Sequence, residues 1–369
     1  MAIYYFTILL LTGGGFLFTT MPYAKVLKLS VQKSMTVYLA AVFCILTLLT
    51  SLRYAIGFDY FSYRTIYEMS ADASFHDIYQ YYGFEPLFFA VCKLSTLIGL
   101  PFQAFLTVIN IFLLFTALWF VSRYSKLPWM SIYLYLTLQF LAYDMNLIRQ
   151  AIAVSFFLLA YPYLKDRKII PFSILLFIGG LFHNSLWFIY PLYFLLPIKI
   201  SRRFAAILSA LAAFGYLLFD TLFPLIQPFL PTKYAIYEQT YFWNSNAWEY
   251  ILLPTIYCIL IYLFRNRIDD PVKRSIFLNS AFYHFLISLF ITKHFILERF
   301  AIYPFVFSLI AIPEIISSYH TENNHKKRIC VTLLFLLFGG AYFLFAAAKG
   351  YHNVYPYISL FEKSRSTPL

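Results

Sequence analysis

Asn146-Leu147-Ile148-Arg149-Gln150 and, after an apolar run and a basic turn, Phe182-His183-Asn184-Ser185 place polar side chains inside hydrophobic sequence. In a helix Asn146, Arg149 and Gln150 share one face, because their spacing is i, i+3 and i+4. A charge in that setting is costly unless it meets a partner or a water-filled cavity, so Arg149 predicts a functional site. The alternative is that Arg149 extends from a helix end to a lipid headgroup.

The composition indicates a membrane protein. The 369 residues are 62% hydrophobic and 12% charged, whereas soluble domains carry about 25% charged residues. The net charge of +12 arises in short loops between apolar runs, which is a topological pattern and not a nucleic-acid surface. We therefore expect an all-α polytopic integral membrane protein, a single membrane domain over residues 1–369, and no nucleic-acid partner.

The cysteines and glycines suggest no cofactor. Cys44, Cys92, Cys258 and Cys330 lie in apolar segments without a CxxC spacing, so we expect small buried side chains and neither disulfides nor a metal site. Gly13-Gly14-Gly15 lacks the Lys-Ser/Thr of a phosphate loop, and close helix packing explains it better. No His, Asp and Cys spacing suits a metal ion.

Loop charges predict the topology. Placing the basic loops in the cytoplasm gives about twelve transmembrane helices with both termini outside. The predicted crossings are residues 2–20, 34–52, 102–121, 129–143, 147–164, a pair within 171–197, 204–219, 250–264, 276–291, 300–316 and 329–348. Residues 53–85 and 220–248 then form loops on the outer, periplasmic side.

Two segments are ambiguous. Residues 86–99 include Lys93 and are shorter than the roughly 20 residues of a crossing, so we expect a short interfacial or partly inserted helix. Residues 171–197 have basic loops on both sides, which favours a re-entrant hairpin with His183-Asn184-Ser185 at its apex. The alternative makes 86–99 a crossing and 171–197 a single span, but it moves two basic loops to the outer side.

The predicted topology collects polar residues on the outer face. They are Arg53, Asp59, Arg149, His183, Arg299 and the Tyr355-Pro356-Tyr357 tail. Several arginines with few competing carboxylates suit a phosphate or pyrophosphate ligand, because guanidinium groups bind phosphate oxygens in pairs and stay charged.

Structural roles are the alternatives for the same residues. Asp59 can pair with Arg53 or Arg64, or cap a helix. Glu298 and Arg299 can form an interfacial ion pair. His183 can be a hydrogen-bonded packing residue, although its pKa range also suits proton transfer.

In these residues the chain resembles the EpsG-like branch of Wzy-type polysaccharide polymerases. The matching motifs, in order, are Arg53-x3-Gly57-x-Asp59-x3-Tyr63, Glu85-Pro86-Leu87-Phe88, Asn146-x2-Arg149-Gln150-x2-Ala153, Phe182-His183-Asn184-Ser185 and Glu298-Arg299-x3-Tyr303. Each motif alone is weak, but their order and spacing over residues 50–305 are specific.

The resemblance implies a glycosyltransferase of the bacterial inner (cytoplasmic) membrane. It would polymerise oligosaccharide repeat units carried on undecaprenyl pyrophosphate, as O-antigen, capsule or exopolysaccharide, with its active site facing the periplasm. A chain-length regulator and a flippase would be its partners, together with the lipid bilayer. The expected reaction is a metal-independent displacement at the anomeric carbon, without a cofactor.

We assign roles to the motif residues as expectations. Arg149, with Arg299 or Arg53, would stabilise the departing pyrophosphate. His183 is the first candidate to accept the proton of the attacking hydroxyl, and Asp59 is the second. The remaining residues would position sugar or lipid phosphate; these are Tyr63, Glu85, Asn146, Gln150 and Tyr303.

Other functions remain as alternatives. A membrane acyltransferase would use His183, and its activity would be retained after Arg149 and Arg299 are neutralised. A polysaccharide ligase would use similar arginines. A lipid-linked oligosaccharide transporter or flippase would move its substrate without lengthening it, although the paired halves common in transporters are not evident.

Overall fold

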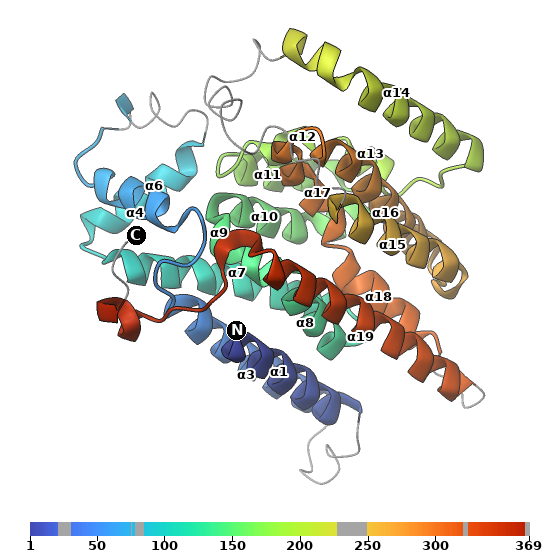
Figure 1. The fold of residues 1–369 in the computed structure, drawn as a ribbon, viewed down its shortest axis with the longest axis horizontal. Helices are drawn as coiled ribbons and strands as arrows, with labels where there is room; N and C mark the ends of the chain where they lie inside the picture. Colours follow the sequence, from blue (N-terminus) through green and yellow to red (C-terminus); the bar gives the residue numbers. More distant parts are fainter. Residues whose placement is uncertain (21–30, 75, 78–84, 227–248, 320–323, 366–369) are drawn as a thin grey trace.

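The computed structural model describes residues 1–20, 31–74, 76–77, 85–226, 249–319 and 324–365 (Figure 1). The α-helices of this part are α1 (Ala2–Thr20), α3 (Val31–Ser51), α4 (Tyr60–Met69), α6 (Pro86–Leu97), α7 (Phe102–Tyr124), α8 (Pro128–Thr137), α9 (Phe140–Asn146), α10 (Ile148–Lys165), α11 (Ile169–Gly180), α12 (Ser185–Phe188), α13 (Leu192–Leu195), α14 (Arg202–Ile226), α15 (Glu249–Phe264), α16 (Pro271–Ile291), α17 (Glu298–Phe305), α18 (Ser308–Ser317) and α19 (His325–Ala348). Short 3-10 helices are η3 (Arg265–Arg267), η4 (Phe295–Leu297), η6 (Tyr351–Asn353) and η7 (Leu360–Arg365).

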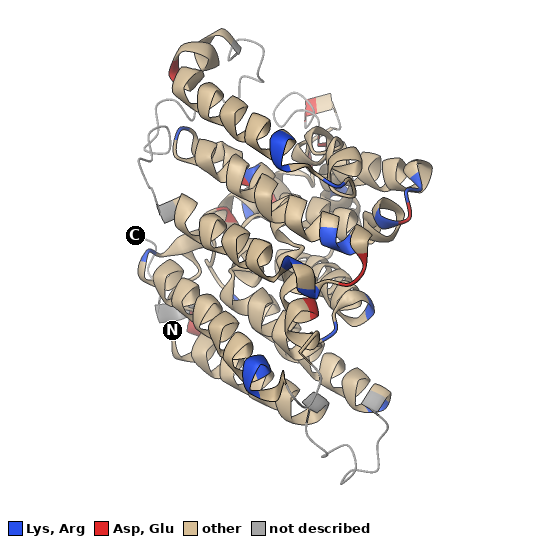
Figure 2. Cartoon of the chain, turned by 90° about the vertical axis from the view of Figure 1, so that its right-hand side faces the viewer, with Lys and Arg blue, Asp and Glu red and all other residues tan. Residues whose placement is uncertain are grey.

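The long apolar helices confirm the predicted all-α polytopic membrane class. Within the described ranges, 6 segments are long and apolar enough to cross a bilayer: Gln32–Ser51, Phe102–Tyr124, Arg202–Leu225, Pro271–Ile291, Phe295–Ser317 and His325–Ala348. Shorter apolar helices are Ala2–Phe18, Pro86–Leu97 and Ile169–Gly180. Figure 2 shows long stretches of helix without a charged residue, as a hydrocarbon environment requires.

Two predicted crossings are broken helices. The 129–143 segment is interrupted between α8 and α9, where Gln139 adopts a left-handed backbone with φ 68°. The 300–316 segment is interrupted between α17 and α18 at Val306-Phe307. All residues of α8 are buried. The surrounding protein can therefore shield the backbone groups that the break exposes.

The 171–197 segment forms the hairpin that loop charges favour. After α11 the chain turns through residues 181–184, and the returning arm, with α12 and α13, packs back along it. Ser173 Oγ lies 2.9 Å from Tyr190 OH, and the rings of Phe172 and Tyr193 are 4.8 Å apart. His183 therefore lies at the turn of a hairpin and not inside a single crossing.

Two predicted loops contain helix. Residues 53–85 include α4, which packs beside α6 and α7. The prediction of a loop from residue 220 is wrong at its start, because α14 continues to Ile226; residues 227–248 lie outside the described part. Figure 1 shows α14 to one side of the other helices, and Tyr216 OH meets Thr292 Oγ1 at the end of α16 (3.2 Å).

Basic connections and polar motifs lie at opposite ends of α10. Near its C-terminus Lys165 pairs with Asp270 (3.4 Å), and in the same region Lys273 of α16 pairs with Glu314 of α18 (3.2 Å). The N-terminus of α10, at Ile148, lies with the turn of the 171–197 hairpin and the start of α17. The fold thus separates the basic loops from the polar residues singled out in the sequence.

Candidate active site

The polar motifs meet where several helices begin or end. Helix α9 ends at Asn146, Leu147 leaves the helical region (φ −104°, ψ 58°), and α10 begins at Ile148. Asn146 and Arg149 therefore lie in different helices, so the shared face that their spacing would give in one helix does not form. The break places the amide of Asn146 at the end of one helix and Arg149 in the first turn of the next.

Arg149 is paired with a buried carboxylate. Its Nη1 forms an ion pair with Oε2 of Glu85, the residue that precedes α6. The Arg149 side chain is 21% exposed and that of Glu85 is 2% exposed. The expectation that the arginines meet few competing carboxylates is wrong for Arg149. The ring of Tyr63 completes its surroundings, with the guanidinium carbon 5.9 Å from the ring centroid.

Glu85 also ties the hairpin turn to the arginine. Its other oxygen, Oε1, accepts the backbone N–H of Asn184 (3.4 Å) and lies 4.0 Å from Nε2 of His183. Because one carboxylate contacts α10 and the hairpin turn, it fixes the position of Arg149 relative to both.

His183 belongs to a buried hydrogen-bond chain. Its Nδ1 lies 2.7 Å from Ser185 Oγ, which in turn lies 2.7 Å from the hydroxyl of Tyr303. Gln150 joins this chain by donating to Ser185 Oγ (3.4 Å) and to the backbone carbonyl of Arg299. The chain connects α10, the hairpin and α17, and His183 is only 5% exposed.

Asp59 and Asn146 form the other side of the site. The backbone N–H of Asp59 donates to Oδ1 of Asn146 (3.2 Å), and the amide of Asn146 contacts Nδ1 of His352 (3.3 Å). Asp59 occupies the position before α4 but makes no capping hydrogen bond. Gly57 allows this approach, because its φ is +97° and an added Cβ would lie 3.2 Å from Asn146 Cα.

Asp59 lies in the electrostatic field of two arginines. Burial raises the pKa of the half-buried Asp59, and the charges of Arg299 and Arg149 oppose that rise. Both arginines therefore favour the ionised form of Asp59. Arg64, its alternative partner, pairs with Glu68 at 2.7 Å instead.

Arg53 does not join this group. Its guanidinium is fully buried and donates to the carbonyls of Thr50 (2.6 Å) and Met145 (3.3 Å) and to Oδ1 of Asn110 (3.2 Å). Burial lowers the pKa of Arg53 to about 10. These contacts join α3, α7 and the end of α9.

The C-terminal tail packs beside Arg53. Ser359 forms an antiparallel bridge with Arg53, and Tyr357 OH donates to the carbonyl of Leu49 (2.8 Å). Tyr355 OH donates to Gln139 at the α8–α9 break (2.8 Å). The tail thus supports the helix ends that carry the site.

The sequence model of the EpsG family matches residues 36–359. The chain belongs to the EpsG family. It is a Wzy-like polysaccharide polymerase family, so at the coarse level the protein is a polymerase-type glycosyltransferase. The EpsG match spans every motif residue described above. Comparisons with curated proteins and with solved structures return no match.

Some EpsG-site residues were not assigned a role from sequence. Ser185 belongs to the Phe182-His183-Asn184-Ser185 motif, but its hydrogen bond with Tyr303 forms only in the folded hairpin. Little in the sequence indicated His352, because it lies in the tail, far in sequence from its partner Asn146. The nearby Tyr355-Pro356-Tyr357 motif was the available hint.

The cysteines are less uniform than expected. Cys92 is buried, but Cys44 and Cys330 are exposed on the surfaces of their helices, so the expectation that all are buried is wrong. Among the described residues of this EpsG-family chain, no group of three or more His, Cys, Asp and Glu side chains is arranged to hold a metal ion.

Proposed function

We propose that this protein polymerises oligosaccharide repeat units linked to undecaprenyl pyrophosphate, at the periplasmic face of the bacterial inner membrane. The observation that carries the proposal is that Arg149, in the first turn of α10, and Arg299, in the first turn of α17, lie where these two helix starts meet. Guanidinium groups suit a pyrophosphate leaving group, because they hold its oxygens through fixed pairs of N–H donors.

The proposed reaction is a direct displacement without a metal ion. A hydroxyl oxygen of one lipid-linked unit bonds to the anomeric carbon of the growing chain. The bond from that carbon to the pyrophosphate oxygen breaks, and the pyrophosphate leaves with the electron pair. Arg149 and Arg299 stabilise the negative charge that develops on the leaving group.

The geometry favours Asp59 as the group that accepts the hydroxyl proton. Asp59 is half-buried, and burial raises its pKa, which is the direction that suits a general base. His183, the first candidate from sequence, is bonded to Ser185 through Nδ1 and faces Glu85 through Nε2. We assign His183 to positioning Glu85, and through it Arg149. Tyr63, Asn146, Gln150 and Tyr303 hold the surrounding framework.

Purified protein in lipid nanodiscs, given lipid-linked single repeat units and a chelator, tests this function. We expect the native protein to produce a ladder of products resolved by size. Arg149→Ala and Asp59→Asn should slow formation of the ladder strongly, whereas the control Arg64→Ala, in an exposed pair with Glu68, should retain the native rate. A native protein without a ladder contradicts polymerisation and favours a ligase or transporter. A ladder that requires added metal contradicts the metal-free mechanism.

The outer location rests on the separation of the site from the basic loops. Cysteine labelling of intact cells tests it in a variant with Cys44 and Cys330 replaced by Ser. An impermeant thiol reagent should label Ser74→Cys, in the exposed end of the α4 loop, and not Asn266→Cys, in the exposed turn after α15. The reverse pattern places the site on the cytoplasmic face and contradicts the proposal.

A further inference from the structure

A cavity lies beside the site, bounded by the ends of several helices. It is lined from α9, α15, α16, α17, α19 and η6, has a volume of about 70 Å³ and opens partly to solvent. One water molecule occupies roughly 10–15 Å³ of such a volume. The cavity therefore has room for several polar groups of a ligand, although no role was assigned to it from sequence.

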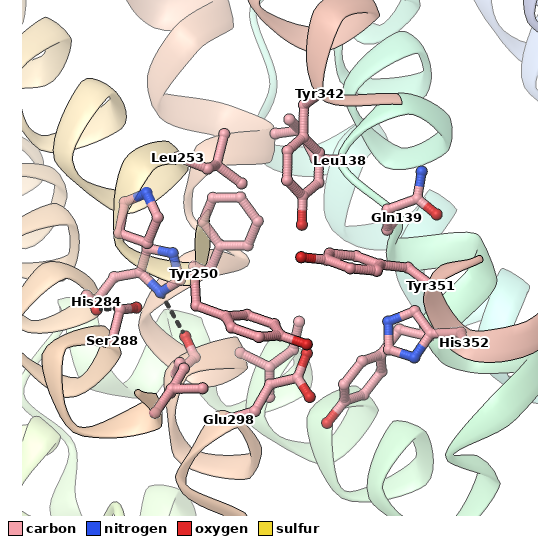
Figure 3. A pocket seen from close by; sticks show the side chains of 16 residues that line it. Leu138, Gln139, Tyr250, Leu253, His284, Ser288, Glu298, Tyr342, Tyr351 and His352 are labelled. Atoms are coloured by element: carbon pink, nitrogen blue, oxygen red, sulfur yellow. Dashed lines mark hydrogen bonds between the residues drawn. The ribbon is translucent and has the colours of Figure 1, made fainter. Parts of the chain in front are cut away.

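Polar groups converge inside this cavity. Figure 3 shows the hydroxyls of Tyr250, Tyr342 and Tyr351 and the carboxylate of Glu298 turned toward its middle. The Glu298 carboxylate lies in the field of the neighbouring Arg299. A carboxylate at the wall of a cavity also requires hydrogen-bond donors, which the hydroxyls of a ligand can supply.

Two buried polar atoms in the lining of the cavity also require hydrogen-bond partners. Among the described residues, neither Tyr143 OH nor His284 Nε2 has a hydrogen-bond partner, and their residues are 4% and 6% exposed. His284 Nδ1 lies 3.0 Å from the carbonyl of Ala301 and donates to it, so Nε2 is left as an acceptor. Unpaired buried groups are uncommon and indicate an absent partner.

Aromatic faces complete the chemistry of the cavity. The rings of Tyr250 and Tyr351 stack with their centroids 5.7 Å apart. The ring of Tyr143 meets His352 edge to face at 5.6 Å. Of the described residues that line the cavity, none is a lysine or arginine. An uncharged ligand rich in hydroxyls fits this lining better than a phosphate, because hydroxyls can pair with the carboxylate and the imidazole.

The cavity adjoins the polar site through two connections. Glu298 immediately precedes Arg299 in the first turn of α17, and His352 lines the cavity while contacting Asn146. Burial lowers the pKa of His352 to about 4, so the ring is neutral at pH 7. Positive φ values at Gly350 (67°), His352 (60°) and Asn353 (50°) hold this turn, and strained backbone of this kind clusters at functional sites.

From this geometry we infer that the cavity is a sugar-binding subsite, in which Glu298 accepts hydrogen bonds from the hydroxyls of a sugar ring of the repeat unit. The inference rests on the proposed polymerase function for the identity of the sugar. It divides the substrate between two neighbouring regions: the arginines bind the pyrophosphate, and the cavity binds the carbohydrate.

A binding experiment tests the subsite independently of turnover. The soluble oligosaccharide repeat unit, released from its lipid, is titrated calorimetrically into the full-length protein in nanodiscs. Glu298→Gln should weaken binding about tenfold to a hundredfold, as expected for loss of a charge-assisted hydrogen bond. Tyr342→Phe removes only a hydroxyl and should weaken binding less. The control Glu68→Gln, at an exposed position, should bind like the native protein.

Undecaprenyl pyrophosphate without sugar separates the two regions. We expect its affinity to be unchanged in Glu298→Gln and Tyr342→Phe. Native-like oligosaccharide binding by both variants overturns the subsite, as does a native protein that binds no oligosaccharide. The polymerisation assay separates the two proposals. If the native protein makes a ladder but both variants bind the oligosaccharide as it does, only the subsite is overturned. If the variants lose oligosaccharide binding but the native protein makes no ladder, only polymerisation is overturned.

Discussion

The surroundings of Arg53 and Arg149 differ although both arginines lie in hydrophobic sequence. Arg53 is fully buried and binds the carbonyls of Thr50 and Met145. Arg149 is partly exposed and pairs with the carboxylate of Glu85. The first arginine joins α3, α7 and the end of α9, whereas the second joins α10 to the residue before α6. Two arginines in similar apolar sequence thus have different partners, and these partners are the basis for proposing a packing role for Arg53 and a ligand-binding role for Arg149.

The largest expected effect is on turnover at Arg149. Arg149→Ala should reduce kcat about 100-fold to 1,000-fold, the loss typical of one preorganised donor to a developing anion. Arg149→Lys should recover part of the activity, because charge returns without the paired donors. The ladder assay measures both, and native-like kcat in Arg149→Ala contradicts the assignment. Circular dichroism checks that the variants stay folded.

The Arg53 variant should fail by a different route. Arg53→Met should lower stability by about 1–3 kcal/mol for each buried carbonyl left unpaired. Thermal unfolding in detergent and the yield of membrane-inserted protein measure this loss. Those molecules that fold should keep a near-native kcat. Native yield and stability with no activity would instead place Arg53 in the site, as the sequence motif suggests.

The fold class, and the approach of most of the polar motifs to one another, could be predicted from the sequence. Apolar run lengths and basic loops predict the helices, and the hairpin at His183 follows from the same loop charges. The break at Gln139 was not predictable, because neither Gly nor Pro marks it; the buried surroundings of α8 and the bond from Tyr355 stabilise it. The Arg149–Glu85 pair was also missed, since long-range side-chain contacts leave no local pattern.

Substitution of Gly57, which lies against Asn146, should have a smaller effect on stability and turnover. Gly57→Ala should cost roughly 1–3 kcal/mol for a left-handed backbone, and its Cβ would also press on Asn146 at 3.2 Å. Gly99→Ala is a matched control, because Gly99 has a φ of +71° but open space around it. Thermal stability should fall in both, and kcat only in Gly57→Ala. Equal kcat losses would contradict a specific role for the Gly57 contact.

The smallest expected effect is a change in pH dependence. Activity should fall as pH decreases through the pKa of Asp59, because only the ionised carboxylate accepts a proton. Burial raises this pKa and Arg299 opposes the rise, so Arg299→Gln should move the acid limb of the residual activity to higher pH. Arg64→Gln, whose guanidinium pairs with Glu68, should leave the limb in place. An unmoved limb in Arg299→Gln excludes Asp59 as the titrating base.

The helix break at Leu147 has a consequence for charge that involves no side chain. Because of the break, a new helix N-terminus, that of α10, lies beside the first turn of α17. The Gln150 side chain links the two helix starts by donating to the carbonyl of Arg299. Aligned peptide dipoles concentrate about half a unit of positive charge at the start of each helix. The backbone itself therefore favours an anion between them. A variant lacking both guanidinium groups should still attract pyrophosphate weakly, with an affinity that declines steeply as ionic strength rises.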